Sequence, residues 1–307
     1  MTATAIIEEQ KRVFQETEYF RAGFREKPYQ TCIERYFFKR YTEDGMTSQF
    51  VYLPIAWFDM TYRYGSDQRS REYLEHMSPL VDKFVQTLIP EFTYFTIVHA
   101  GPIESLWHCL LKIKQLTVYA SSGPVLWPET SLRRQMEYIP LPLMSDRVPS
   151  GIPERERDVF ASFYGGITHP IREKMIHVVE HLPEFMTGGH KPKQEYFQMM
   201  RRSVFSLSPR GANPSSLRMY EAMQLGSIPV YVNNEIFLPY RHLLDWSELC
   251  VTVHESELVD LPKILHCISL ERIRRMQEAI GRFEAEFLHH ERTYQEILTS
   301  LAEKAKG

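Results

Sequence analysis

The sequence predicts an α/β protein built from two doubly wound domains, and three observations carry this prediction. Short apolar segments rich in β-branched and aromatic residues alternate with segments of helical periodicity along most of the 307 residues. Residues 203–232 fit a strand, a glycine-containing loop, a helix, a glycine stop and a second strand. Residues 139–157 concentrate prolines, a glycine and charges, which is typical of a linker between domains.

The first half of the chain is expected to form one domain over residues 1–145. Aromatic and β-branched residues favour strands, and 3.6-residue spacing favours helices. On these grounds we expect helices within residues 1–25, 68–89 and 106–114, and strands at 33–38, 50–55, 94–98 and 115–120.

The second half is expected to form a second domain over residues 146–270, followed by a C-terminal helix over 271–307. Its predicted elements are strands at 159–163, 204–207 and 228–232, helices at 171–181 and 257–267, a turn at 188–190 and the helix that follows Pro214. Beyond them, apolar residues recur at helical spacing from Leu270 to Lys304. We expect one long helix that packs back across both domains; a coiled-coil dimer is the alternative, and a monomer or weak dimer is favoured.

The composition excludes several classes of protein. Hydrophobic residues at 43% and charged residues at 24% are ordinary for a globular protein. A net charge of -3 argues against a nucleic-acid binder, which needs a basic face. The four cysteines have no C-x-x-C spacing, which suits a reducing compartment. No signal peptide or membrane span is evident, so we expect a soluble, cytoplasmic protein.

The segment 203–232 has the pattern with which open α/β sheets bind phosphorylated ligands. Asn213 is the expected helix N-cap with Pro214 at the first helical position, and Gly226 is the expected left-handed cap at the other end. A helix N-terminus attracts a diphosphate. Arg218 and Glu221 are three residues apart on one helical face, where they could hold a diphosphate and a ribose. A surface ion pair is the alternative for these two residues.

The run S-x-F-x-L-x-P-x-G, then R-x-x-E-A, then G-x-I-P-V resembles the exostosin-like glycosyltransferases of family GT47. Similar blocks occur at residues 160–172 and 244–253, with weaker matches at 51–54 and 98–101. A short chain without an evident membrane anchor is similar to the short family members found in large algal DNA viruses. It differs from the eukaryotic members, which are anchored in a membrane. The resemblance implies a GT-B type fold, with two Rossmann-like domains facing across a cleft, and a nucleotide sugar and a glycan as substrates.

The donor site is expected in the second domain. Glycines at a strand end let a ligand approach the backbone, and arginines neutralise a departing diphosphate. The sequence has no D-x-D signature and no zinc-like spacing, so no metal or other cofactor is expected. With the resemblance, the expected nucleotide-sugar-binding residues are Gly165, Gly166, Arg172, Ser208, Pro209, Arg210, Gly211, Arg218 and Glu221.

The catalytic base is expected in the first domain. Asp59 follows a predicted strand among aromatic residues that could stack on an acceptor sugar, namely Trp57, Phe58 and Tyr62. Helix capping is the alternative role for Asp59. His99 is the second candidate base: it matches a family His-Asp position, although Ala100 replaces the acidic neighbour.

The expected function is therefore inverting, metal-independent transfer from a UDP-sugar to a glycan hydroxyl. The viral resemblance suggests xylose as the sugar and a fucose-containing glycan as the acceptor. Two other classes stay open. One is a non-catalytic nucleotide-sugar or glycan-binding module on the same fold, and the other is a nucleotide-dependent hydrolase or phosphorylase.

Overall fold

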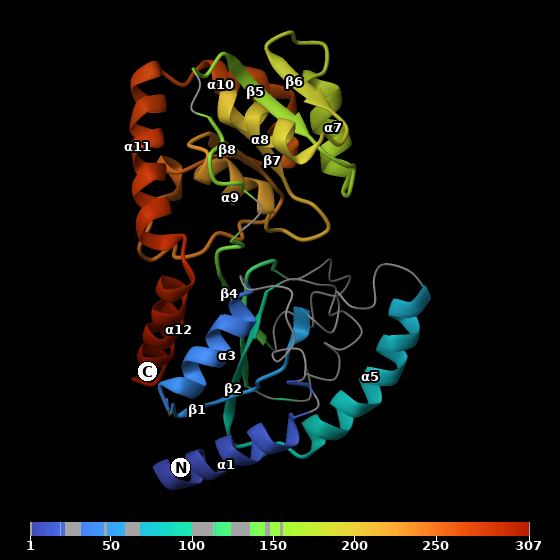
Figure 1. Cartoon of the computed structure of the whole chain (residues 1–307), viewed down its shortest axis with the longest axis vertical. Coiled ribbons are helices and arrows are strands. Elements are labelled where there is room, and N and C mark those ends of the chain that lie inside the picture. The colour runs from blue at the N-terminus through green and yellow to red at the C-terminus, as the bar shows by residue number, and fades with distance from the viewer. Residues whose placement is uncertain are drawn as a thin grey trace. The chain divides into compact units, whose positions relative to one another are not determined.

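The chain folds into two compact units (Figure 1). Unit 1 contains Met1–Leu141 with His290–Gly307, and unit 2 contains Pro142–His289. The chain therefore passes from unit 1 to unit 2 within the segment expected to be a linker. The computed structural model describes residues 2–18, 20–21, 32–45, 48–58, 68–99, 113, 115–123, 136–144, 148–153 and 156–306.

Unit 1 is built on a four-stranded, all-parallel sheet. Its strands follow one another in chain order: β1 (Phe50–Tyr52), β2 (Thr93–Val98), β3 (Leu116–Ala120) and β4 (Met136–Pro140). The helices described in this unit are α1 (Ala3–Glu16), α3 (Ile33–Glu43), α5 (Gln68–Gln86) and α12 (His290–Lys304).

Aromatic side chains form the core of unit 1. Phe37 of α3 packs against Phe95 of β2 and Tyr294 of α12, with ring centroids 5.9 and 5.2 Å apart. The side chain of Gln10 in α1 donates to the carbonyl of Tyr52 and accepts from its N–H, so α1 occupies the edge of β1. Helices from both ends of the chain thus complete this unit.

Unit 2 is built on a five-stranded, all-parallel sheet in the order β6-β5-β7-β8-β9. Its strands are β5 (Val159–Tyr164), β6 (Phe185–Gly188), β7 (Ser203–Pro209), β8 (Ile228–Val232) and β9 (Val251–Val253). The order reverses between β5 and β7, which makes this point the topological switch point where such sheets bind ligands. Right-handed crossovers place α7 (Pro170–Val179) on one face and α8 (Lys193–Arg202) and α9 (Leu217–Gln224) on the other.

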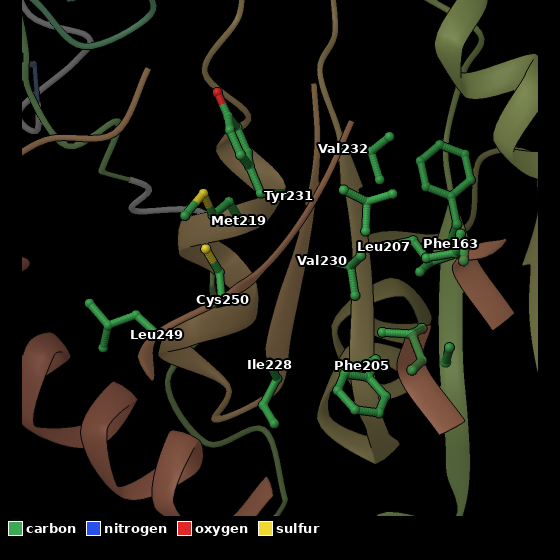
Figure 2. Packing of buried hydrophobic residues seen from close by; sticks show 14 of the residues in the cluster. Phe163, Phe205, Leu207, Met219, Ile228, Val230, Tyr231, Val232, Leu249 and Cys250 are labelled. Carbon is green, nitrogen blue, oxygen red and sulfur yellow. The ribbon is translucent and has the colours of Figure 1, made fainter. Parts of the chain in front are cut away.

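The core of unit 2 lies around its central strands (Figure 2). Phe163, Phe205, Leu207 and Val230 project from β5, β7 and β8 into one buried cluster. Burying each such side chain contributes about 1.5–3 kcal/mol. Further helices complete the unit: α10 (Leu261–His266), α11 (Leu270–Phe287) and the 3-10 helices Trp246–Glu248 and Glu255–Asp260. This buried cluster holds β5, β7 and β8 in place and thereby positions the residues at their carboxyl ends.

Most elements predicted within the described residues are present, but two assignments are wrong; the helix expected at 106–114 lies outside the described residues except for residue 113. Residues 33–38 belong to helix α3 and not to a strand. Ile33, Phe37 and Tyr41 are four residues apart, so a helix places all three on the face that enters the core. The C-terminal segment is two helices, because α11 ends at Phe287 and α12 begins at His290. Helix α11 belongs to unit 2 and α12 to unit 1.

The helix after β7 also starts later than predicted. Helix α9 begins at Leu217 with Ser216 as its N-cap, not at Pro214. The Pro214 carbonyl accepts from the Tyr231 hydroxyl and from the Asn233 amide, at 3.2 and 2.8 Å, and these partners hold it outside the helix. The predicted end is confirmed, since Gly226 has φ +67° just beyond the helix.

Candidate functional site

The predicted donor-site residues gather at the carboxyl ends of β5 and β7. These strands are paired in parallel, with Ser162 opposite Ser206, so they end at the same edge of the sheet. The Gly165-Gly166 turn follows β5, and the Arg210-Gly211 loop follows β7. The first turns of α7 and α9 contribute Arg172 and Arg218. Residues far apart in the sequence therefore meet at the switch point of the sheet.

Arg218 lies against the end of β5. Its Nη2 donates to the carbonyl of Tyr164 at 2.5 Å, and its guanidinium lies 4.5 Å from the ring centre of Phe163 and 5.1 Å from that of Tyr196. Cation–π contacts of this kind orient the planar guanidinium. A Cβ at Gly165 would lie only 2.6 Å from Nη2, so the absence of a side chain there permits the approach.

Arg172 connects the two loops. Its Nε donates to the carbonyl of Arg210 and its Nη1 to that of Gly166, both at 2.9 Å. A Cβ at Gly211 would lie 3.0 Å from Nη2 of the same guanidinium. Burial and, after it, the positive charge of Arg218 lower the pKa of Arg172 to about 10, and Tyr196 acts in the opposite direction.

Arg172 and Arg218 bring two positive charges close together at a position that is unfavourable for a cation. Burial and the positive charge of Arg218 both disfavour the cation of Arg172, and Arg172 also lies in the first turn of a helix, at the positive end of the helix dipole. The carbonyl groups that bind the two guanidinium groups carry no formal charge. Two guanidinium groups oriented in this way suit an anion with several oxygens, such as a diphosphate.

Tyr196 is a site residue that the sequence analysis missed. Its ring lies under the guanidinium of Arg218, and its hydroxyl donates to Glu221 Oε2 at 2.8 Å. It comes from α8, so only the fold brings it to α9. Glu221 is 1% exposed, which excludes the alternative of a surface ion pair. Tyr196 thus connects the two charged residues of the α9 face.

Two of the predicted donor-site residues, Ser208 in β7 and Arg210 directly after it, have hydrogen-bond partners within the protein. Ser208 is fully buried and donates to the carbonyl of Ser206 at 3.0 Å, so its hydroxyl faces the protein interior. Arg210 is also buried, and its guanidinium donates to the carbonyls of Gly211 and Ala212 at 3.4 Å. Pro209 ends the strand. These residues shape the loop, whereas Arg172 and Arg218 supply charge at the strand ends.

His169 caps the helix that carries Arg172. Its Nδ1 accepts from the N–H of Ile171 at 3.2 Å. Burial lowers the pKa of His169; the positive charges of Arg210, Arg172 and Lys174 act in the same direction, and Glu255 opposes them. Because the folded-state pKa lies below the unfolded value, the contribution of His169 to stability is complete above about pH 6.5 and is lost as the pH falls.

We expect His169→Asn to reduce the acid sensitivity of unit 2. Asparagine keeps a side-chain acceptor at the N-cap but does not titrate in this range. The melting temperature of wild type should therefore fall more steeply between pH 7 and pH 5 than that of the variant, measured by circular dichroism. Parallel curves for the two proteins would contradict a role for His169 in acid sensitivity.

The residues predicted to bind the acceptor or to act as the base belong to unit 1. Trp57 is 0% exposed and its indole N–H donates to Thr96 Oγ1 at 2.8 Å, so it belongs to the core and offers no face to a sugar. Phe58 is half-buried, and its ring meets the His99 ring edge-on at 5.0 Å. Asp59 and Tyr62 lie outside the described residues.

The described part of the chain offers neither a metal-binding cluster nor a membrane-spanning helix. No cluster of three or more histidine, cysteine, aspartate or glutamate side chains there could hold a metal ion. None of the helices found there is both long enough and apolar enough to cross a membrane.

Comparison with known proteins identifies the region that carries this site. Residues 118–268 match the Exostosin GT47 domain, which extends from β3 through β9 to α10. The region that carries the site is thus similar to the Exostosin GT47 domain. The match contains all nine residues predicted for the donor site, so the GT47 resemblance seen in the sequence is confirmed for this part of the chain.

Curated relatives of the GT47 domain are named glycosyltransferases. "Probable glucuronosyltransferase GUT1" of Oryza sativa subsp. japonica is 40% identical over 88 residues, which is 29% of this chain and 21% of that protein. "Probable beta-1,4-xylosyltransferase IRX10" of Arabidopsis thaliana is 38% identical over 86 residues, covering 28% and 21%. The matched part of this chain spans about a fifth of the length of these relatives.

A solved structure with similarity to this chain is the α,α-trehalose 6-phosphate synthase of Burkholderia multivorans. The TM-score is 0.43 and the sequence identity is 10%, over 81% of this chain and 79% of that one.

Proposed function

We propose that this chain is an inverting glycosyltransferase that needs no metal ion and moves a sugar from a UDP-sugar to a hydroxyl of a glycan. The observation that carries the proposal is the pair Arg172 and Arg218 at the switch point of a sheet within a GT47 domain. Their charges are oriented by backbone carbonyls and are suited to the diphosphate of the donor. Glu221, beside Tyr196, is proposed to accept hydrogen bonds from the ribose hydroxyls.

The proposed reaction is a single displacement. The acceptor oxygen attacks the anomeric carbon of the donor, and the bond from that carbon to the diphosphate oxygen breaks. A general base removes the acceptor proton, and UDP leaves with both electrons of the broken bond. Arg172 and Arg218 would stabilise the negative charge that develops on UDP. The proposed candidates for the general base are Asp59 and, second, His99.

Xylose is the proposed donor sugar, and a fucose-containing glycan is the proposed acceptor. The xylosyltransferase name of one relative supports xylose, while the glucuronosyltransferase name of another supports glucuronic acid as the second choice. The fucose acceptor rests on the resemblance to the short members from algal viruses. The protein is proposed to be a monomer or a weak dimer.

We expect calorimetry to detect UDP binding in the presence of EDTA, at least about tenfold tighter than UMP, because only UDP offers the second phosphate to the arginine pair. UDP release should then be measured with UDP-xylose, UDP-glucuronic acid and other UDP-sugars, with and without fucosylated acceptors. Acceptor-dependent release supports the transferase. UDP binding without release from any donor would favour a binding module, and acceptor-independent release would favour a hydrolase.

A further inference from the structure

Glu34 is a buried acidic residue in unit 1 that neither the sequence motifs nor the proposed function uses. It lies in the first turn of α3 and is 1% exposed. Burial of a carboxylate is costly unless hydrogen bonds compensate for the lost water. The partners of Glu34 therefore indicate what the residue does.

The carboxylate of Glu34 binds two backbone segments that leave the sheet. It accepts from the N–H of Phe58 at 3.0 and 3.2 Å and from the N–H of His99 at 2.7 Å. His99 directly follows β2, and Phe58 lies on the segment that follows β1. Strands β1 and β2 are parallel neighbours, so both segments emerge at the carboxyl edge of the sheet, where α/β units bind ligands.

The two segments also meet through their side chains. The rings of Phe58 and His99 are perpendicular, with centroids 5.0 Å apart. A single carboxylate thus sets the separation of the two backbones that carry this pair. Charge-assisted hydrogen bonds to backbone N–H groups are strong and directional, so they suit this purpose.

We propose that Glu34 is a positioning residue for the acceptor side of the site, because its carboxylate holds the backbones of Phe58 and His99 and thereby places the two rings. This inference rests on the proposed transferase function. Glu34 acts through its partners and is not assigned any contact with a substrate.

Glu34→Gln tests the proposal with little change in shape. The amide keeps one oxygen acceptor but turns an NH2 group toward the backbone donors, so at least one hydrogen bond is lost. Glu9→Gln is the matched control. Glu9 is also a buried glutamate of unit 1, 3% exposed, and it accepts from Arg12 and from the Tyr94 hydroxyl near the start of β2.

The expected result is a change confined to the acceptor reaction of Glu34→Gln. The value of kcat/KM for the acceptor should fall about 10- to 100-fold, mainly through the acceptor KM, while UDP affinity stays at the wild-type value. Glu9→Gln should keep wild-type acceptor kinetics at temperatures where circular dichroism shows both proteins folded. Equal losses in the two variants, or no loss in Glu34→Gln, would overturn the proposal.

A second measurement separates this inference from the transferase itself. The imidazole NMR signals of His99, assigned by their loss in His99→Gln, should shift in Glu34→Gln and not in Glu9→Gln. If they stay in place, the proposal fails whether or not the protein transfers sugar. If Glu34→Gln does not fold, Glu34→Asp keeps the charge on a shorter side chain and should produce the same shift and a smaller kinetic loss. Absence of UDP binding and transfer in the wild type would instead refute the proposed function.

Discussion

Replacement of Arg218 by alanine is expected to lower kcat/KM by about 100- to 1,000-fold, the loss typical of a donor that stabilises developing charge. UDP affinity should fall by about 10- to 100-fold as well, because the lost group carries a full positive charge. The physical reason is the geometry at the end of β5. Arg218 is fixed by the carbonyl of Tyr164 and by the rings of Phe163 and Tyr196, so no other side chain can take its place without rearrangement.

The measurements are calorimetry with UDP and the rate of UDP release with donor and acceptor. Arg202→Ala is the matched control, because Arg202 lies on unit 2 and pairs with Asp158 on the surface. Such a surface pair contributes little to stability. Arg202→Ala should therefore retain wild-type binding and activity. Near-normal transfer by folded Arg218→Ala would eliminate the diphosphate role of Arg218.

Replacement of Gly165 by alanine is expected to have the second-largest effect, about 100-fold on kcat/KM. The new Cβ would lie 2.6 Å from Nη2 of Arg218, so the guanidinium must move away from the Tyr164 carbonyl. The atom that moves is the flexible end of a side chain, and Gly165 does not have a positive φ. The fold should therefore survive, and the melting temperature should change little.

Gly189→Ala is the control for this prediction, because a Cβ at Gly189 meets no heavy atom within 4 Å. A double-mutant cycle sharpens the test. If Gly165→Ala acts by displacing Arg218, it should cause no further loss in a protein that already carries Arg218→Ala. Additive losses would mean that Gly165 acts by another route.

Local patterns predicted the second unit well. The strand after Arg202, the left-handed cap at Gly226 and the strand at Ile228 are set by signals a few residues apart, namely apolar alternation and a glycine stop. The similar block at residues 160–172 predicted the other donor-site residues, Gly165, Gly166 and Arg172. Arg172 and Arg218 could be predicted together because each lies in the first turn of a helix that follows a parallel strand, and the carboxyl ends of these strands meet at one edge of the sheet.

Other features depended on contacts that local patterns do not contain. Aromatic enrichment predicted a strand at Ile33, but packing of Phe37 and Tyr41 against the sheet favours a helix there. Trp57 has the composition of a sugar-stacking residue, yet its bond to Thr96 places it in the core. Asn213 and Pro214 have a helix-start signature, which the contacts of Tyr231 and Asn233 override.

The sequence by itself determined that this is an α/β chain with two domain-sized halves, a GT47 pattern in the second half, and a glycine turn and two arginines at its predicted strand ends. Periodicity and glycine positions are local properties, so one chain suffices to recognise them. Only the tertiary structure decided that Tyr196 joins Arg218 to Glu221 and that Glu34 joins Phe58 to His99. These contacts link helices and strands tens of residues apart, and their geometry exists only after the sheets have formed.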